Sequence, residues 1–189
     1  MNLTISVSPT SEPITVEQQK TWSRITDDAE DAHLEYLITG ARTHVEQYLQ
    51  RALMTQTLIQ RHDCWPSVLE LERGPVQSVT SVEYIDVDGV TRTVTASNYW
   101  ADLNSTPARI MPITSYAWPS LQFGRPNAVI ATYVAGYASA DDVPAPIRMG
   151  ISLLVDHLYE NRGPILIGQL LQEIPYSVQA LLAPYRIWC

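Results

Sequence analysis

Apolar residues recur at helical spacing in three separate stretches of the chain. The longest covers residues 27–52 and predicts an amphipathic helix of about 25 residues. In residues 144–162 an apolar stripe follows Pro146, a residue type favoured in the first turn of a helix. The third stretch lies between Pro175 and Pro184. The pattern therefore predicts a long N-terminal helix, a central packing helix and a C-terminal helix.

Between the first two helices the chain changes to strand-forming residues. Their β-branched and alternating character predicts short strands over residues 55–62 and 68–71. Residues 82–87 and 90–94 are expected to pair as a hairpin, because Asp88-Gly89 between them is a favoured two-residue turn. This hairpin is the clearest strand signal in the sequence.

Prolines limit the strands that follow the hairpin. Residues 98–126 contain four prolines, so we expect no long central strand there and only an edge strand at Ala108-Arg109-Ile110. A last strand is expected over residues 127–135. Because helices flank a small, mostly antiparallel sheet, the predicted fold class is α+β.

The same patterns divide the chain into parts. Residues 1–14 are rich in Ser, Thr and Pro and are expected to form an extended N-terminal arm. Residues 15–184 are expected to form a single domain with a β-rich insertion over about residues 54–135. Pro184 is expected to end the last helix, which leaves residues 185–189 as a C-terminal tail.

Composition and charge narrow the function classes. The 189 residues are 46% hydrophobic and 17% charged, as in a globular protein, and the net charge is −8. Proteins that wrap nucleic acid neutralise phosphates with clustered Lys and Arg, and this chain has no basic run. Cys64 and Cys189 cannot form a disulfide framework. No apolar stretch is long enough for a membrane span, and the N-terminus lacks the pattern of a signal peptide.

Few residues suggest chemistry. His62-Asp63-Cys64 is the one place where an imidazole, a carboxylate and a thiol occur together, and on a strand positions 62 and 64 share a face. Zinc requires three or four ligands at suitable spacing, and the other histidines do not provide it. Phosphate-binding and hydrolase motifs are absent from the sequence. We therefore expect no catalytic site, no metal and no cofactor.

Two segments near the C-terminus favour assembly with other chains. Residues 163–174 join two helices but are apolar where a polar loop is usual, so they either fold back onto the core or are covered by another subunit. Tyr185, Arg186 and Trp188 are residue types enriched in interface hot spots.

Short motifs follow one another over residues 30–186 in a specific order and spacing. They include Arg51 to Thr57, Trp65-Pro66, Arg73 to Val82, Pro107 to Ile110, Trp118-Pro119, Thr132 to Tyr137, Tyr159 to Arg162 and Leu181 to Arg186. Together they resemble the head-tail connector family of tailed bacteriophages and prophages, whose members are adaptor or head-completion proteins.

The resemblance implies a structural protein of the virion that is not an enzyme. It implies a homo-oligomeric ring of twelve copies beneath the portal protein, joined to a stopper or tail-completion protein and continuing a channel through which DNA passes without sequence-specific binding. It implies a fold that is mainly a helical bundle with a small antiparallel sheet inserted. The expected location is the head–tail interface of the virion, after assembly in the host cytoplasm and without membrane contact.

The resemblance also assigns candidate interfaces. The C-terminal helix and tail of the family engage the portal, which implies portal-binding residues Tyr176, Leu181, Leu182, Tyr185, Arg186, Ile187 and Trp188. The apolar linker, where a more polar one is expected for the family, supplies candidates for a contact with another subunit or with the tail: Ile165, Leu166, Ile167, Leu170 and Leu171.

Two other functions stay open at this point. A small phage-encoded hydrolase using His62 and Cys64 would be a monomer with a pocket around those residues. A binding module would be monomeric or dimeric and would need no portal.

Overall fold

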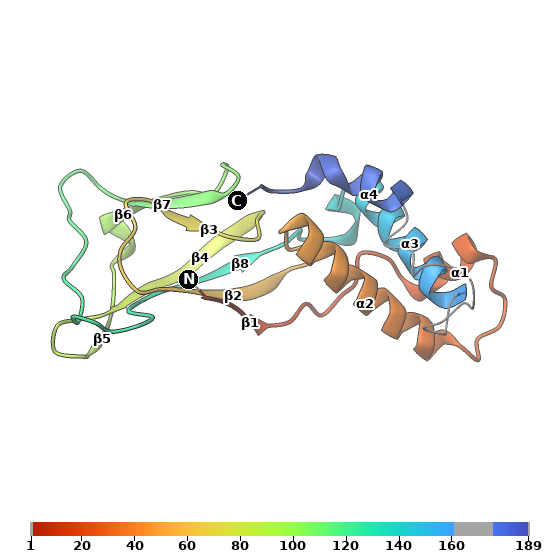
Figure 1. The fold of residues 1–189 in the computed structure, drawn as a ribbon, viewed down its shortest axis with the longest axis horizontal. Coiled ribbons are helices and arrows are strands. Elements are labelled where there is room, and N and C mark those ends of the chain that lie inside the picture. The colour runs from red at the N-terminus through yellow and green to blue at the C-terminus, as the bar shows by residue number, and fades with distance from the viewer. Residues whose placement is uncertain (1, 161–175, 189) are drawn as a thin grey trace. The chain divides into compact units, whose positions relative to one another are not determined.

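The structure is a computed structural model that describes residues 2–160 and 176–188 (Figure 1). The chain divides into two compact units. Unit 1 comprises Met1–Thr10 and Thr55–Tyr137, and unit 2 comprises Ser11–Met54 and Ala138–Cys189. Unit 1 contains the strands and unit 2 contains the α-helices. The division of the chain expected from the sequence, with an arm before one domain and a tail after it, stays a prediction.

Unit 1 is built from two antiparallel sheets. The first has the strand order β1-β2-β8-β4-β5, and the second has the order β3-β7-β6. The strands are β1 (Asn2–Val7), β2 (Gln56–His62), β3 (Leu69–Leu71), β4 (Val76–Ile85), β5 (Thr91–Thr93), β6 (Tyr99–Asp102), β7 (Ala108–Pro112) and β8 (Val129–Ala135). A short 3-10 helix, Ala96–Asn98, precedes β6.

One face of the five-stranded sheet is buried along its central strands. Leu58 of β2 lies opposite Tyr133 of β8, and both are fully buried. Directly opposed residues of an antiparallel pair share a face, and the alternating burial of β2 and β8 follows from this. The second sheet contributes three more fully buried residues to the core of unit 1: Leu69, Leu71 and Ile110.

Gln60, which is fully buried, joins the two sheets by hydrogen bonds. Its Nε2 donates to the carbonyl oxygen of Glu70 at 2.7 Å, and its Oε1 accepts from the backbone N–H of Glu72 at 3.0 Å. The hydroxyl of Tyr133 lies 2.7 Å from the carbonyl oxygen of Glu72 and 3.1 Å from Gln60 Oε1. Burial raises the pKa of Tyr133, which favours the protonated hydroxyl.

The hairpin of β4 and β5 is held by the carboxylate of Asp86. The backbone N–H of Asp86 donates to the carbonyl of Val90, and Gly89, at φ 80°, donates back to the carbonyl of Asp86. The loop therefore has three residues, of the kind that ends in a glycine bulge, and not the expected two. Oδ1 of Asp86 accepts the N–H groups of Asp88 and Val90, and Oδ2 accepts Nε of Arg92. These bonds lower the pKa of Asp86, and the bond from Arg92 has the largest effect.

Unit 2 contains the α-helices of the described residues. They are α1 (Val16–Ser23), α2 (Asp31–Leu49), α3 (Ala145–Glu160) and α4 (Tyr176–Leu182), with short 3-10 helices at Ala140–Asp142 and Ala183–Tyr185. Thr15 and Gln18 form a capping box at the start of α1. α2 has 19 residues, fewer than expected: it begins only at Asp31, and it ends where Gln50 adopts a left-handed conformation. None of the described helices meets the length and hydropathy that a membrane span requires.

The core of unit 2 combines an apolar face with a buried ion pair. Ile147 and Ile151 of α3 and Leu34 and Val45 of α2 are fully buried. Arg42, on the same helix as Val45, is also mostly buried and pairs with acidic side chains.

Arg42 and Glu46 fix the end of α2 to the chain that follows it. Nη1 of Arg42 lies 2.9 Å from Oε2 of Glu46, and Nε of Arg42 lies 2.7 Å from Oε2 of Glu12. Oε1 of Glu46 accepts the backbone N–H of Leu53 at 2.7 Å. A buried charge is tolerated when it is paired and hydrogen-bonded, and Glu46, 1% exposed, meets both conditions.

The expectation of a mainly helical bundle with a small inserted sheet is wrong. In the described part of the chain, eight strands form two antiparallel sheets beside four α-helices, so the fold is a mixed α+β fold. The sheet is larger than expected because its strands pair across long separations, such as Gln56 with Ala135. Residues 2–7 of the expected arm also join it as β1. Local patterns of residues do not reveal such pairings.

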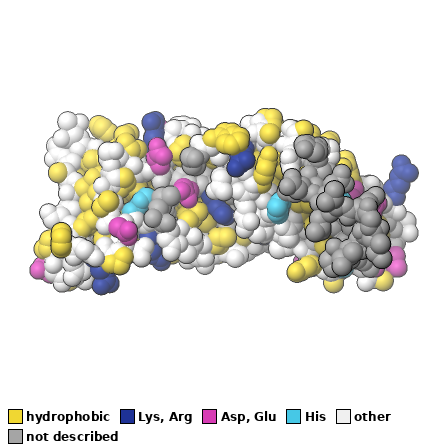
Figure 2. Space-filling view, in the orientation of Figure 1, with side chains coloured by type: hydrophobic (Ala, Val, Ile, Leu, Met, Phe, Trp, Pro, Cys, Tyr) yellow, Lys and Arg dark blue, Asp and Glu magenta, His cyan; other side chains and the backbone are white. Residues whose placement is uncertain are grey.

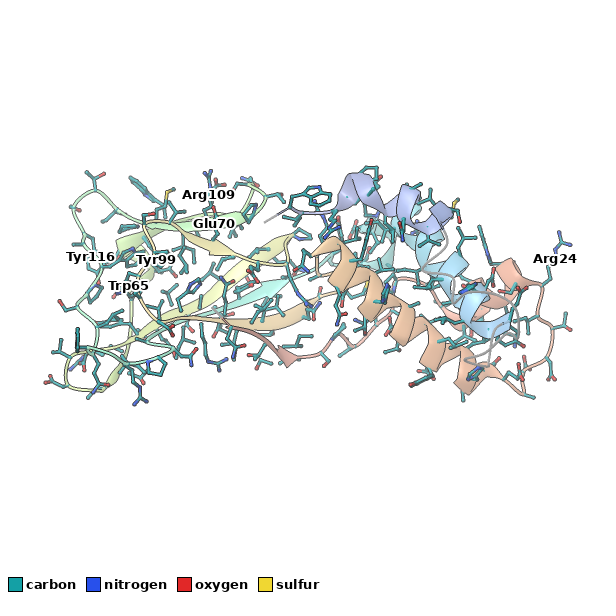
Figure 3. The ribbon with its side chains drawn as sticks, viewed as in Figure 1. Arg24, Trp65, Glu70, Tyr99, Arg109 and Tyr116 are labelled. Carbon is teal, nitrogen blue, oxygen red and sulfur yellow. The ribbon has the colours of Figure 1, made fainter. Side chains whose placement is uncertain are left out.

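The expectation of an edge strand at residues 108–110 is also wrong. β7 lies between β3 and β6 in the three-stranded sheet, with Leu69 opposite Ile110 and Ala101 opposite Ile110 on the other side. Pro112, which lacks an N–H, stands at the last position of β7, so it does not interrupt the pairing. Glu70 and Arg109 are opposed across β3 and β7, and both are labelled in Figure 3.

Candidate docking surface at the C-terminal tail

Close packing with α3 positions helix α4. A Cβ atom at Gly150 of α3 would lie 3.1 Å from Cδ2 of Leu182, so a glycine allows the two helices to approach at this point. Leu182 is 2% exposed and Val178 is fully buried. These residues form the inner face of α4. Leu181 is half-buried.

The chain after α4 returns to the end of α2 and is bound there. The backbone N–H of Ile187 donates to the carbonyl oxygen of Leu49 at 2.9 Å. Nε of Arg51 donates to the carbonyl oxygen of Tyr185 at 2.5 Å. The side chain of Ile187 is 7% exposed. Residues 185–188 therefore form a segment that is held on unit 2 by hydrogen bonds and by one buried apolar side chain.

Arg186 lies against two aromatic rings. Its guanidinium carbon is 4.3 Å from the ring centroid of Trp188 and 5.1 Å from that of Tyr48 on α2. Contacts of a cation with aromatic faces at these distances are attractive. Trp188 is nevertheless 76% exposed. A large aromatic side chain is thus held at the surface without being buried.

The arginines of this surface are among those that lack a carboxylate partner in the described part of the chain. Four arginines have carboxylate partners: Arg42, Arg92, Arg109 and Arg148. For Arg51 and Arg186 the described residues provide no ion pair, and Nε of Arg186 is buried without a hydrogen-bond acceptor among them. In a chain of net charge −8, this surface holds two guanidinium groups without a carboxylate partner among the described residues, beside an exposed indole. We call Tyr48, Arg51, Tyr185, Arg186 and Trp188 the tail surface.

The structure brings together only part of the residue set expected to bind the portal. Tyr185 and Arg186 are half-buried and Trp188 is exposed, so these three belong to the tail surface. Leu182 and Ile187 are buried within unit 2 and contribute to its packing. The side chain of Tyr176 lies outside the described residues.

The second predicted interface lies wholly outside the described residues. It comprises Ile165, Leu166, Ile167, Leu170 and Leu171 of the linker 163–174. Their role as a contact with another subunit or with the tail stays a prediction.

His62, Asp63 and Cys64 lie at the end of β2 and each has a different environment. The Nε2 atoms of Gln60 and His62 are 2.9 Å apart, and burial lowers the pKa of His62. Asp63 Oδ1 accepts the backbone N–H of Asn127 at 2.7 Å, and Cys64 is exposed. Within the described ranges no three His, Cys, Asp or Glu side chains are grouped to hold a metal ion. The observed contacts of His62 and Asp63 are structural.

The structure shows an aromatic cluster in unit 1 that the sequence analysis missed. The rings of Trp65 and Trp118 are stacked with centroids 4.3 Å apart and planes 4° from parallel. Tyr116 meets Trp118 edge to face at 6.4 Å, and Trp65 Nε1 donates to the carbonyl oxygen of Pro119 at 2.9 Å. Figure 3 labels Trp65 and Tyr116 at this cluster. The cluster anchors the proline-rich segment, and the two Trp-Pro pairs of the sequence are its signal.

Tyr48 and Arg51 of the tail surface were also missed as site residues. Both lie at the C-terminal end of α2 or just after it. Arg51 and its partner Tyr185 are separated by 134 positions in the sequence. Nothing in the local pattern of residues 48–51 indicates that a distant segment binds there.

Comparisons with known proteins give a family match for part of the chain and a fold for the whole of it. Residues 13–99 match the family described as phage gp6-like head-tail connector protein. A search of curated protein sequences found no match. Among solved structures, a chain of the "neck of empty GTA particle computed with C6 symmetry" is 23% identical, with a TM-score of 0.82 over 100% of this chain and 97% of that chain.

Two other solved structures have the same coverage at 22% identity. They are chains of the "virion of native gene transfer agent (GTA) particle", with a TM-score of 0.78, and of the "neck of native GTA particle computed with C12 symmetry", with a TM-score of 0.75. At these identities the likeness shows a common fold. The match over residues 13–99 bears out the resemblance that the sequence motifs indicated: this part of the chain is similar to the phage gp6-like head-tail connectors.

Proposed function

We propose that this protein is a structural adaptor at the head–tail junction of a phage-like virion, where its copies form a ring beneath the portal and the tail surface docks on the portal protein. The family match supports the connector role and the virion location. The ring is supported by the solved relatives, which are described as parts of particle necks computed with C6 and C12 symmetry. We propose twelve copies on the same ground.

The exposed Trp188 beside Arg186 is the observation that carries the docking proposal. Binding energy at protein interfaces is concentrated in a few Trp, Tyr and Arg side chains that become buried on association. Trp188 is 76% exposed in the chain alone, and its position is fixed by the contact with Arg186 and by the adjacent anchor at Ile187. A side chain held in place before binding loses less entropy on binding.

The net charge of −8 supports a channel that does not bind DNA. Tight binding to DNA requires neutralisation of phosphates by basic side chains, and an acidic protein repels the phosphate backbone. We propose that DNA passes without sequence-specific contact and that the side of the ring away from the portal meets a stopper or tail-completion protein. We also propose that the protein is not an enzyme, in line with the structural role of its family.

Docking on the portal is tested with two variants and one matched control. Trp188→Ala and Arg186→Ala are mixed with portal rings of the same phage or prophage, and bound protein is measured by co-sedimentation. Hot-spot truncation costs at least about 2 kcal/mol of binding free energy, so the affinity measured from the bound fractions is expected to fall about 30-fold or more. Trp100→Ala is the control, because Trp100 is an exposed tryptophan, 58%, on unit 1. Wild-type binding by both tail variants would refute the docking proposal.

A further inference from the structure

The core face of the five-stranded sheet continues onto β1, where it is no longer covered. Leu3 is opposite Gln60, and Ile5 is opposite Leu58. Opposed residues share a face, so Leu3 and Ile5 lie on the face that Gln60 and Leu58 bury completely. Leu3 is half-buried, but Ile5 is 48% exposed. Beyond a bulge, Val7 is 55% exposed opposite Thr57.

β1 is also an open sheet edge with little protection. It has β2 as its single neighbour in the described sheet. Natural proteins usually protect such edges with charged residues, prolines or bulges. Residues 2–11 contain no charged residue, and the first proline, Pro9, follows the strand. The bulge between Ile5 and Val7 is the one protective feature within β1. The strand can therefore be covered by another chain without burying a charge.

A second exposed apolar surface lies at the opposite edge of the same sheet. The strand order places β5 at the far end from β1. In the loop between β4 and β5, Val87 is 61% exposed and Val90 is 50% exposed. The adjacent segment adds Phe123, which is fully exposed, and its neighbour Gln122 packs beside Gly89 of the hairpin. Figure 2 shows hydrophobic side chains exposed over this end of unit 1.

We call Val87, Val90 and Phe123 the hairpin tip. Its backbone is fixed before any partner binds, because the Asp86 carboxylate accepts the N–H groups of Asp88 and Val90 and the Arg92 guanidinium. A rigid apolar surface of this kind needs little ordering when it associates.

The two edges also carry complementary charges. Arg61, opposite Asn2 in the β1–β2 register, donates from Nη1 to Thr4 Oγ1, and no carboxylate pairs with it among the described residues. Asp88, between the two exposed valines of the hairpin tip, is exposed and has no ion pair there either. Each edge therefore carries an apolar surface and one charge of opposite sign, with Arg61 on the sheet face opposite to Ile5.

We propose that neighbouring copies of this chain contact one another through two different surfaces of unit 1, with the β1 edge of one copy packed against the hairpin tip of the next. A closed ring requires a contact that joins two different surfaces of the same chain, and β1 and the hairpin tip are two such surfaces. Copies with a net charge of −8 repel one another, so their contact is expected at a surface that is apolar and locally balanced in charge. The inference rests on the proposed ring.

Site-specific cross-linking tests the pairing of the two edges. In a chain carrying Cys64→Ser and Cys189→Ser, the substitutions Ile5→Cys and Val90→Cys are introduced separately and together. Particles are assembled with each variant as the sole source of this protein and treated with a short bis-maleimide. The double variant is expected to give a ladder of covalent multimers, and each single variant is expected to stay monomeric. A strong dimer from Ile5→Cys alone, or incorporation of the double variant without cross-links, would overturn the proposal.

Charge exchange gives a second readout. Arg61→Glu and Asp88→Arg are each expected to lower the cross-linking yield about two- to fivefold, the range for an exposed ion pair, and the double exchange is expected to restore it. Arg24→Glu, an exposed arginine of unit 2 labelled in Figure 3, is the control. A lower cross-linking yield in both single variants that is not restored in the double exchange would contradict the pairing of Arg61 with Asp88.

The same experiment separates this inference from the proposed function. If wild-type protein does not enter particles, the adaptor function fails, and cross-linking of the double variant in concentrated solution then tests the pairing alone. If wild-type protein enters particles but the two edges do not cross-link, the contact between the β1 edge and the hairpin tip is refuted and the adaptor function stands.

Discussion

The backbone N–H of Ile187 donates to the carbonyl oxygen of Leu49, 2.9 Å away, so the last residues of the chain cap the end of helix α2. The final carbonyl groups of a helix lack partners within the helix. Ile187 supplies one of these partners and buries its own side chain at the same place. Stability and the display of Trp188 therefore depend on the same short segment.

Ile187→Ala is expected to destabilise unit 2 by about 2–5 kcal/mol, the range for truncating a buried aliphatic side chain. Urea unfolding followed by circular dichroism measures the change. Trp188→Ala, one residue away but exposed, is the matched variant and is expected to stay within about 0.5 kcal/mol of wild type. Equal losses of unfolding free energy in the two variants would contradict a packing role for Ile187 and an exposed, non-packing role for Trp188.

Glu46→Ala is expected to cost about 3–5 kcal/mol, because it leaves the buried Arg42 without its partner on α2 and the N–H of Leu53 without an acceptor. Glu46→Gln keeps an oxygen that can accept from Leu53, so its loss is expected to be smaller. Chemical denaturation of both variants provides the measurement. A wild-type midpoint for Glu46→Ala would show that the ion pair contributes nothing.

Gly40→Ala and Gly150→Ala are expected to have different effects although both glycines lie within helices. Alanine is favoured over glycine in a helix by up to about 1 kcal/mol, and nothing lies within 4 Å of a Cβ atom at Gly40. At Gly150 the new methyl would lie 3.1 Å from Leu182 Cδ2, so crowding offsets this gain. In thermal melts, the melting temperature of Gly40→Ala is expected to be higher than that of the wild type and higher than that of Gly150→Ala. The reverse order would mean that α4 does not pack at this place.

Acid is expected to loosen the β4–β5 hairpin. The bond from Arg92, followed by backbone bonds, lowers the folded pKa of Asp86 below the ordinary value of 3.8. The ionised carboxylate therefore stabilises the hairpin above that value, and the stabilisation is lost as the pH falls through the lowered folded pKa. Amide chemical shifts of Asp88 and Val90 followed from pH 7 downward report the transition. Asp86→Asn removes the titrating group and is expected to abolish the transition. A transition that persists in this variant would belong to another titrating group.

Much of unit 2 follows from local features of the sequence. The apolar stripe of α3 is buried at Ile147, Ile151 and Val155, as its spacing predicted, and Leu158 at its end is partly exposed. The hairpin at residues 82–94 lies close to its expected place because turns and periodicity act between residues a few positions apart. The family motifs are likewise local strings of residues. The types of Tyr185, Arg186 and Trp188 marked the tail as an interface candidate for the same reason.

Tertiary structure decided the size of the sheet and the composition of the tail surface. Gln56 pairs with Ala135, and Arg51 binds the carbonyl of Tyr185 across 134 residues of chain. Such contacts depend on how the whole chain closes, and the residues involved carry no local pattern that marks their partners. β1 illustrates the same limit, because six residues with the composition of an arm became a strand only where β2 offered a free edge. Periodicity therefore determined which segments could bury a face, and long-range pairing determined which face each segment buried and which surfaces stayed open.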